Sequence, residues 1–328
     1  MEDRTSDFFD LYDFKVLRTY KGRGALICET DQGMMVLREY NGTQEKVALQ
    51  DLIMNRIKTE DGIRVDHFIK NKEEGIISTD VRNQTYIVKK WYDGTECNIL
   101  SLQDIEEATK VLSQIHQLLA SEDLIYENQK KMPSIVNEFE RKTRELKKIR
   151  SFVRGRAQKN EFDHLFLEYF DTFFSDAQDV MDQISGWNEE KFLSNVKESG
   201  QICHGNFTHH NVIKDQNGWI VINFEKYSFD TRIRDLCQFM RKVLEKNEWD
   251  IAFMEKMLYS YQKRSPLSAE ETAYLYFRLA FPEKFWKIAN YYYNTNKAWI
   301  SEKNISKLKI LITQNSAKRE LVGKMRYL

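Results

Sequence analysis

The chain has 328 residues, of which 41% are apolar and 30% are charged, and it contains only three prolines. This composition is ordinary for a globular protein and leaves room for a large core. The 50 basic and 50 acidic residues cancel, so the overall charge neither favours nor excludes a polyanionic partner. The four cysteines form no CxxC pair, which argues against a zinc ribbon and predicts reduced thiols in a cytoplasmic protein.

The ends and the apolar segments of the chain give no sign of a membrane. The first ten residues are acidic and lack the apolar core of a signal peptide. No apolar run approaches the roughly 18 residues of a membrane-spanning helix. We therefore expect neither a transmembrane segment nor a membrane partner.

Strand patterns dominate the first ninety residues. Residues 25–30 and 34–40 predict a hairpin around the turn Asp-Gln-Gly at 31–33. Residues 44–58 predict a helix with an apolar face that includes Leu52. Two more strands are expected at residues 74–78 and 84–91.

The pattern changes after a predicted hinge turn at residues 92–95. Amphipathic helices are expected at residues 102–120, 135–151 and 162–184, and everything from residue 232 onward reads as helix. One hairpin interrupts them, with strands at 211–214 and 219–224 around an Asn-Gly turn. The predicted class is α+β: a two-lobed protein-kinase-like fold, with a small antiparallel-sheet lobe at residues 1–93 and a larger helical lobe at 94–328.

The most informative motif flanks this hairpin. Residues 204–211 read His-Gly-Asn-Phe-Thr-His-His-Asn, and residues 221–225 read Val-Ile-Asn-Phe-Glu. They resemble the catalytic core of the aminoglycoside phosphotransferase and choline kinase group, H-G-D-x-x-x-x-N followed by I-D-F-[DE]. The matching residues are His204, Gly205, Asn211, Ile222, Phe224 and Glu225. Because both halves and the hairpin occur together, the match is specific.

Three further segments narrow the resemblance to the CotS family of spore coat proteins. They are Trp-Tyr-Asp-Gly-Thr-Glu-Cys-Asn at 91–98, Arg-Asp-Leu at 234–236 and the aromatic run at 281–294. The likeness extends from about Tyr20 to Leu308. It implies a role in sporulation, deposition in the spore coat and other coat proteins as partners.

Two departures from the active pattern decide the functional prediction. The resemblance places the catalytic base at Asn206, and a neutral amide cannot accept the proton of an attacking hydroxyl. It places the magnesium ligands at Asn223 and Asn211, and Asn223 offers only a neutral oxygen where the family has a carboxylate. Glu225 is the remaining carboxylate of this degenerate metal site, and on a regular strand it would point the same way as Asn223.

The positions that bind the phosphates of the nucleotide in the family are also altered. The phosphate-binding lysine of the family corresponds to Arg38, whose acidic partner on the following helix could be Glu45 or Asp51. Gly22 and Gly24 lie where a phosphate-covering loop is expected, although an ordinary turn is the simpler interpretation. The resemblance implies ATP and Mg²⁺ as the cofactors of an active member. For this chain it predicts weak, magnesium-independent ATP binding or none.

Several other features have simple structural interpretations. The closely spaced Cys203, His204, His209 and His210 lack a zinc-ligand spacing, and His204 is expected to brace its loop. His116 is expected in the core. The segment from Arg141 to Lys159 carries nine basic residues; a solvated face is favoured over an anionic partner, and no motif indicates a specific nucleic acid.

Three functions therefore compete. The leading hypothesis is a catalytically impaired pseudokinase that acts as a structural or binding module of the spore coat. The alternative is an active ATP-dependent small-molecule phosphotransferase in which Glu225, Asp230 or Asp235 replaces the lost aspartates. The third is a polyanion-binding protein that acts through the basic segment.

Overall fold

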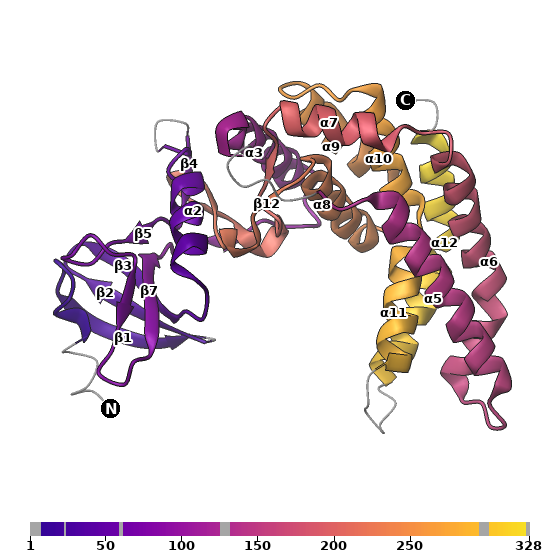
Figure 1. Ribbon diagram of the computed structural model, residues 1–328, viewed down its shortest axis with the longest axis horizontal. Helices are drawn as coiled ribbons and strands as arrows, with labels where there is room; N and C mark the ends of the chain where they lie inside the picture. The colour runs from indigo at the N-terminus through magenta and orange to yellow at the C-terminus, as the bar shows by residue number, and fades with distance from the viewer. Residues whose placement is uncertain (1–7, 23, 59–61, 125–131, 295–301, 326–328) are drawn as a thin grey trace.

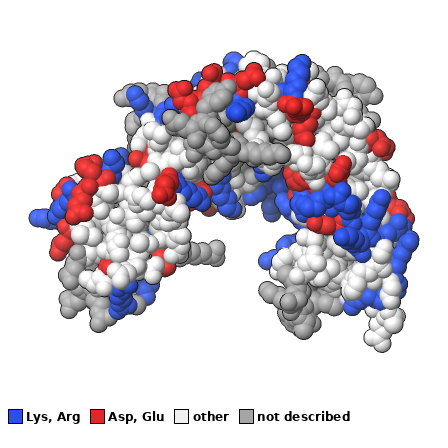
Figure 2. All heavy atoms as spheres, viewed as in Figure 1, with Lys and Arg blue, Asp and Glu red and all other residues white. Residues whose placement is uncertain are grey.

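The computed structural model describes residues 8–22, 24–58, 62–124, 132–294 and 302–325. Figure 1 shows an arch with the strand-rich lobe at one end and helices α5, α6, α11 and α12 at the other. The two-lobed α+β fold is thus confirmed. In Figure 2, basic side chains gather on the inner side of this arch, beneath α8 and over α5.

An antiparallel sheet forms the N-terminal lobe. Its strand order is β1 (Val16–Gly22), β2 (Ala25–Thr30), β3 (Gly33–Glu39), β7 (Thr85–Lys90) and β5 (Phe68–Ile69), and β6 (Ile77–Thr79) also pairs with β7. The predicted hairpin is present as β2 and β3. Strand β1 was not predicted, because most of its residues are exposed and lack apolar alternation.

Helix α2 (Gln44–Met54) follows the sheet. Thr43 caps its first turn through a side-chain bond to the Lys46 N–H. The helix ends before the predicted residue 58. Leu52, expected on the apolar face, is about half exposed, because Val47 and Ile53 define the buried stripe instead.

A second sheet joins the two lobes. Its order is β4 (Ile63–Val65), β11 (Gly218–Val221), β10 (Val212–Asp215) and β8 (Thr95–Glu96), with β4 parallel to β11. The predicted Asn-Gly hairpin is present as β10 and β11, but β11 ends at Val221 rather than at Phe224. The division at residue 93 remains a prediction.

Helices build the rest of the molecule. They are α3 (Leu102–Leu119), α5 (Ile135–Gly155), α6 (Glu161–Ile184), α7 (Glu189–Glu198), α8 (Ile233–Lys246), α9 (Ile251–Gln262), α10 (Ala269–Ala280), α11 (Glu283–Asn294) and α12 (Glu302–Met325). Helix α7 and the two-residue strands β9 (Ile202–Cys203) and β12 (Ser228–Phe229) were not predicted. Among the helices of the described ranges, none has the length and apolar character needed to cross a bilayer.

A separate aromatic core holds the far end of the arch together. It lies between α5, α6, α11 and α12, where Phe285 stacks on Phe166 and Phe173. Of the three adjacent tyrosines, Tyr291 is about half exposed, as expected because a helix cannot bury three successive side chains.

Candidate functional site

His204 braces the loop that carries the motif. Its ring is fully buried, and its Nε2 lies 3.0 Å from the carbonyl oxygen of Ile222. A carbonyl only accepts, so Nε2 carries the proton, and Nδ1 accepts from the backbone N–H of Asn206 at 3.1 Å. Burial lowers the pKa of His204, which favours this neutral tautomer.

Asp235 on α8 anchors the same loop. Its carboxylate accepts from the backbone N–H groups of His204 at 2.7 Å and Gly205 at 2.9 Å, and it lies 3.2 Å from Nε2 of the buried His116. Burial opposes ionisation, but the hydrogen bonds from the His116 side chain and the His204 backbone help to lower the pKa of Asp235. This acid therefore works as a structural anchor.

Three asparagines form a continuous chain of hydrogen bonds. Asn211 Nδ2 donates to the carbonyl oxygen of Asn206 at 2.8 Å, and Asn223 Nδ2 donates to Asn211 Oδ1 at 2.8 Å. Asn223 adopts a left-handed conformation with φ 68° and ψ 58°, which asparagine tolerates better than most residues. The fold thus brings together the predicted base and metal positions.

Arg38 completes this chain from the N-terminal lobe. Its Nη1 donates to Asn223 Oδ1 at 3.0 Å and lies 4.0 Å from a carboxylate oxygen of Glu225. The prediction that Arg38 pairs with an acidic residue on the following helix is therefore wrong. Among the described residues, Arg38 bonds to Asn223 and Glu225, and not to Glu45 or Asp51.

The predicted orientation of Glu225 rested on a regular strand, and that assumption is wrong. The strand ends at Val221, Asn223 turns into the left-handed region, and residues Phe224–Lys226 form a short 3-10 helix, η3. Glu225 still reaches the site, with Oε1 2.9 Å from Lys89 Nζ. Burial opposes its ionisation, but Lys89 and Arg38 lower its pKa, so it is charged at neutral pH.

Sequence reasoning missed two buried residues of the site, Asp66 and Lys89. Lys89 Nζ lies 3.1 Å from Asp66 Oδ2, which also accepts from the backbone N–H of Asn223 at 3.1 Å. The Lys89 side chain is only 1% exposed. Burial raises the pKa of Asp66. Strand alternation gave a signal for Lys89, because it shares the inward face of β7 with the buried Ile87.

The side-chain oxygens of Asn223 and Asn211, two of the predicted metal ligands, are engaged within the protein. Mg²⁺ usually needs one or two carboxylates together with free oxygen ligands. Here the Asn223 side-chain oxygen accepts from Arg38, the Asn211 oxygen accepts from Asn223, and Glu225 is held by Lys89. Two cations, Arg38 and Lys89, face the two acids Asp66 and Glu225, so no surplus negative charge is left for a metal.

Gly22 and Gly24 lie in the tight β1–β2 hairpin. Gly22 pairs with Ala25, and Gly24 has φ 62°; Arg23 lies outside the described residues. This is the geometry of a short turn that needs a left-handed residue. A role in covering phosphates stays a prediction.

The basic segment on α5 is largely paired within the molecule. Arg150 binds Asp171, Arg156 binds the buried Asp163, and Lys142 is buried between two glutamates, Glu138 and Glu283. Arg141 and Arg144 pair with acids one turn along the helix. These ion pairs support the interpretation as a solvated face.

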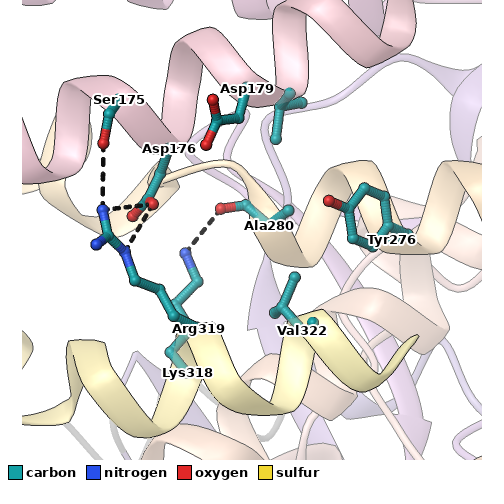
Figure 3. Close-up of a pocket in the computed structure, with 10 residues that line it drawn as sticks. Ser175, Asp176, Asp179, Tyr276, Ala280, Lys318, Arg319 and Val322 are labelled. Carbon is teal, nitrogen blue, oxygen red and sulfur yellow. Dashed lines mark hydrogen bonds and ion pairs between the residues drawn. The ribbon is translucent and has the colours of Figure 1, made fainter. Parts of the chain in front are cut away.

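A polar pocket of about 330 Å³ lies away from the motif, between α6, α10 and α12 (Figure 3). Lys318 donates there to the carbonyl oxygens of Ala280 and Phe281, at 2.9 and 3.3 Å, and Arg319 binds Asp176 at 2.8 Å. Burial lowers the pKa of Lys318 to about 8. The two cations fasten α12 to the end of α10 and to α6.

The chain has a kinase-like fold of the aminoglycoside phosphotransferase type. An aminoglycoside phosphotransferase from Alicyclobacillus acidocaldarius superposes with a TM-score of 0.87 at 17% identity, covering 98% of this chain and 95% of that one. A spectinomycin phosphotransferase solved with ADP and spectinomycin superposes with a TM-score of 0.62 at 14% identity, covering 99% and 98%.

Sequence comparison identifies the family. The chain belongs to the spore coat family described as "Spore coat putative kinase YutH", whose model matches residues 5–325. Spore coat protein S of Bacillus subtilis (strain 168) is 23% identical over 336 aligned residues, covering 99% of this chain and 94% of that protein. The predicted membership of a CotS-like family is confirmed.

Proposed function

We propose that this chain is a catalytically impaired member of its family and serves as a structural or binding module of the spore coat. One observation carries the proposal: the guanidinium of Arg38 bonds to Asn223 Oδ1 at 3.0 Å. That oxygen stands where the related kinases hold a metal-binding carboxylate. The positively charged guanidinium of Arg38 therefore engages the oxygen atom that would otherwise coordinate a metal ion.

The electrostatic consequence for phosphoryl transfer is severe. The reaction depends mainly on positioning and on neutralising the phosphate charge with metal ions. With Asn206 at the base position, the loss of general-base help alone costs roughly 10²–10⁴ in rate. The missing metal carboxylate at Asn223 removes the main electrostatic clamp as well. Both asparagines nearly preserve the shape of aspartate, so the fold survives the loss.

An active phosphotransferase would need another carboxylate, and the three candidates are already engaged. Glu225 is bound by Lys89 at 2.9 Å. Asp230 pairs with Arg234, and Asp235 is buried under two backbone N–H groups of the loop. Releasing any of them would break an existing ion pair or hydrogen bond, which argues for the impaired protein.

The test measures thermal unfolding with excess ATP, with and without Mg²⁺, together with ATP hydrolysis. The wild-type chain is expected to show no magnesium-dependent rise in melting temperature and no hydrolysis. About 1 kcal/mol of binding free energy corresponds to roughly 2–4 °C in a large domain. A magnesium-dependent rise of several degrees, or phosphoryl transfer to any hydroxyl, would overturn the proposal.

Variants that restore the two aspartates test whether Arg38 prevents metal binding. In the double variant Asn206→Asp/Asn223→Asp, the new carboxylate at position 223 lies beside the guanidinium of Arg38. We therefore expect an internal ion pair there and little stabilisation by ATP with Mg²⁺. Adding Arg38→Lys replaces the planar fork with a point charge and frees an oxygen for the metal. Magnesium-dependent stabilisation by ATP should then appear in the triple variant. A full response in the double variant would show that Arg38 does not fill the metal position.

Coat deposition and the partners follow from family membership and are part of the proposal. A fluorescent fusion should concentrate at the forming coat in sporulating cells, and the Asn206→Asp/Asn223→Asp variant should do so equally. A diffuse signal from the wild-type fusion throughout coat assembly would count against a coat role.

A further inference from the structure

The polar pocket of Figure 3 lies between α6, α10 and α12, and none of the residues that line it belongs to the motif. Its volume of about 330 Å³ falls within the range of roughly 300–1,000 Å³ that is usual for small-molecule sites. Helix α6 contributes two carboxylates, Asp176 and Asp179, which face α10 and α12 across the pocket (Figure 3). They share one face of α6 because they are three residues apart.

The two carboxylates have unused capacity to accept hydrogen bonds. Asp176 Oδ1 accepts from Arg319 Nε at 2.8 Å, but Asp176 Oδ2 is buried and has no hydrogen-bond partner among the described residues. The Asp179 carboxylate makes no hydrogen bond or ion pair within the described part of the chain, and the residue is exposed. A buried acceptor without a donor is unfavourable. A ligand that brings donors would therefore be stabilised here.

The two cations of the pocket are already engaged. Lys318 donates to two backbone carbonyl oxygens, and Arg319 donates to Asp176 and to two further groups of α6. Two acids and two bases thus surround the pocket, and their charges balance. A cationic ligand would be repelled by Lys318 and Arg319, and an anionic ligand by Asp176 and Asp179. The charge balance favours a neutral ligand.

The remaining walls of the pocket are apolar or aromatic. Val180, Val322 and Tyr276 line it together with Gly323 of α12. A Cβ at Gly323 would have no atom within 4 Å, so packing does not require glycine at this position. Glycine inside a helix lowers stability relative to alanine. Its effect here is to leave the pocket open.

We propose that this pocket binds a neutral, polyhydroxylated small molecule such as a monosaccharide. Its hydroxyl groups donate to Asp176 Oδ2 and to the Asp179 carboxylate, and the apolar face of its ring packs on Tyr276 and the two valines. A ligand without hydroxyl groups would leave the buried Oδ2 unsatisfied. The inference is independent of the proposed function, because binding in this pocket needs neither Asn206 nor a metal ion.

The test is saturation-transfer difference NMR on the full chain, with methyl β-glucoside as the probe. Glucosamine and glucuronate are the comparison ligands, because they place one positive or one negative charge on a similar ring. We expect transfer to methyl β-glucoside, and dissociation constants at least tenfold higher for the two charged sugars. No transfer to the glucoside would assign Asp176 Oδ2 to bound water and overturn the proposal. Equal or tighter binding of either charged sugar would overturn it as well.

Variants make the assignment specific to the pocket. Gly323→Leu fills the pocket and should abolish the transfer. Gly155→Leu is the matched control and should retain it, because a Cβ at Gly155, the last residue of α5, also has no atom within 4 Å.

A second pair of variants removes one acid each from α6. Asp179→Ala should weaken binding at least tenfold at an unchanged melting temperature, since Asp179 has no partner to lose. Asp182→Ala, at an exposed position of α6 that does not line the pocket, should bind like wild type. This pair decides the matter should Gly323→Leu fail to fold. Transfer that survives both pocket variants would overturn the proposal. Since ATP is not used, failure here leaves the pseudokinase proposal standing.

Discussion

Replacement of Lys89 by methionine should destabilise this protein more than any surface change on the same strand. The Lys89 side chain is 1% exposed and bridges Asp66 Oδ2 at 3.1 Å and Glu225 Oε1 at 2.9 Å. Breaking a buried pair by removing one partner costs about 3–5 kcal/mol, because the other charge stays uncompensated. Most of this cost arises at Asp66, whose side chain is 7% exposed; Glu225, at 38%, is partly screened by water.

The assay is equilibrium unfolding by urea, followed by circular dichroism. Lys90→Met is the matched control, because Lys90 is the exposed neighbour on β7; it should change the free energy of unfolding by less than about 0.5 kcal/mol. Adding Asp66→Asn to Lys89→Met should recover part of the loss, because the uncompensated charge is gone.

The loss should also depend on pH. Without Lys89, the pKa of Asp66 in the folded protein rises further above its unfolded value. The unfolded state then releases the proton first, so the variant loses stability as pH rises above the unfolded pKa. The deficit relative to wild type should shrink towards pH 5. A deficit no larger than that of Lys90→Met would refute the reasoning.

Two further predictions test the loop and the pocket of Figure 3. Gly205→Ala should prevent stable folding, because a Cβ would lie 1.8 Å from the carbonyl oxygen of Lys226 at φ 77°; Gly24→Ala, at φ 62° with no atom within 4 Å, should cost only about 1–2 kcal/mol by thermal unfolding. The pKa of Lys318, lowered to about 8 in the folded protein, means that the unfolded state binds more protons above that pH. Wild type should therefore gain stability relative to Lys318→Met from about pH 8 to 10, by up to ~1.4 kcal/mol per pH unit, and a flat difference between the two curves would contradict this.

The sequence by itself determined the architecture and the positions of the lost carboxylates. Helical spacing placed α3 and α6 almost to the residue, and the Asn-Gly turn placed the β10–β11 hairpin. The motif identified Asn206 and Asn223 because its residues are close in sequence. Local signals fail for β1 because its residues are mostly exposed, and for β4 because its partner β11 lies far along the chain.

Only the tertiary structure decided what surrounds the two asparagines. Arg38 bonds to Asn223 across 185 positions of sequence, and Lys89 reaches Glu225 across 136. No periodicity can specify such contacts, because they depend on how the two lobes pack. The turn at Asn223 likewise redirected Glu225 away from the regular strand. The charge balance around Asn223 is therefore a property of the folded chain, formed where β3, β7 and the motif meet.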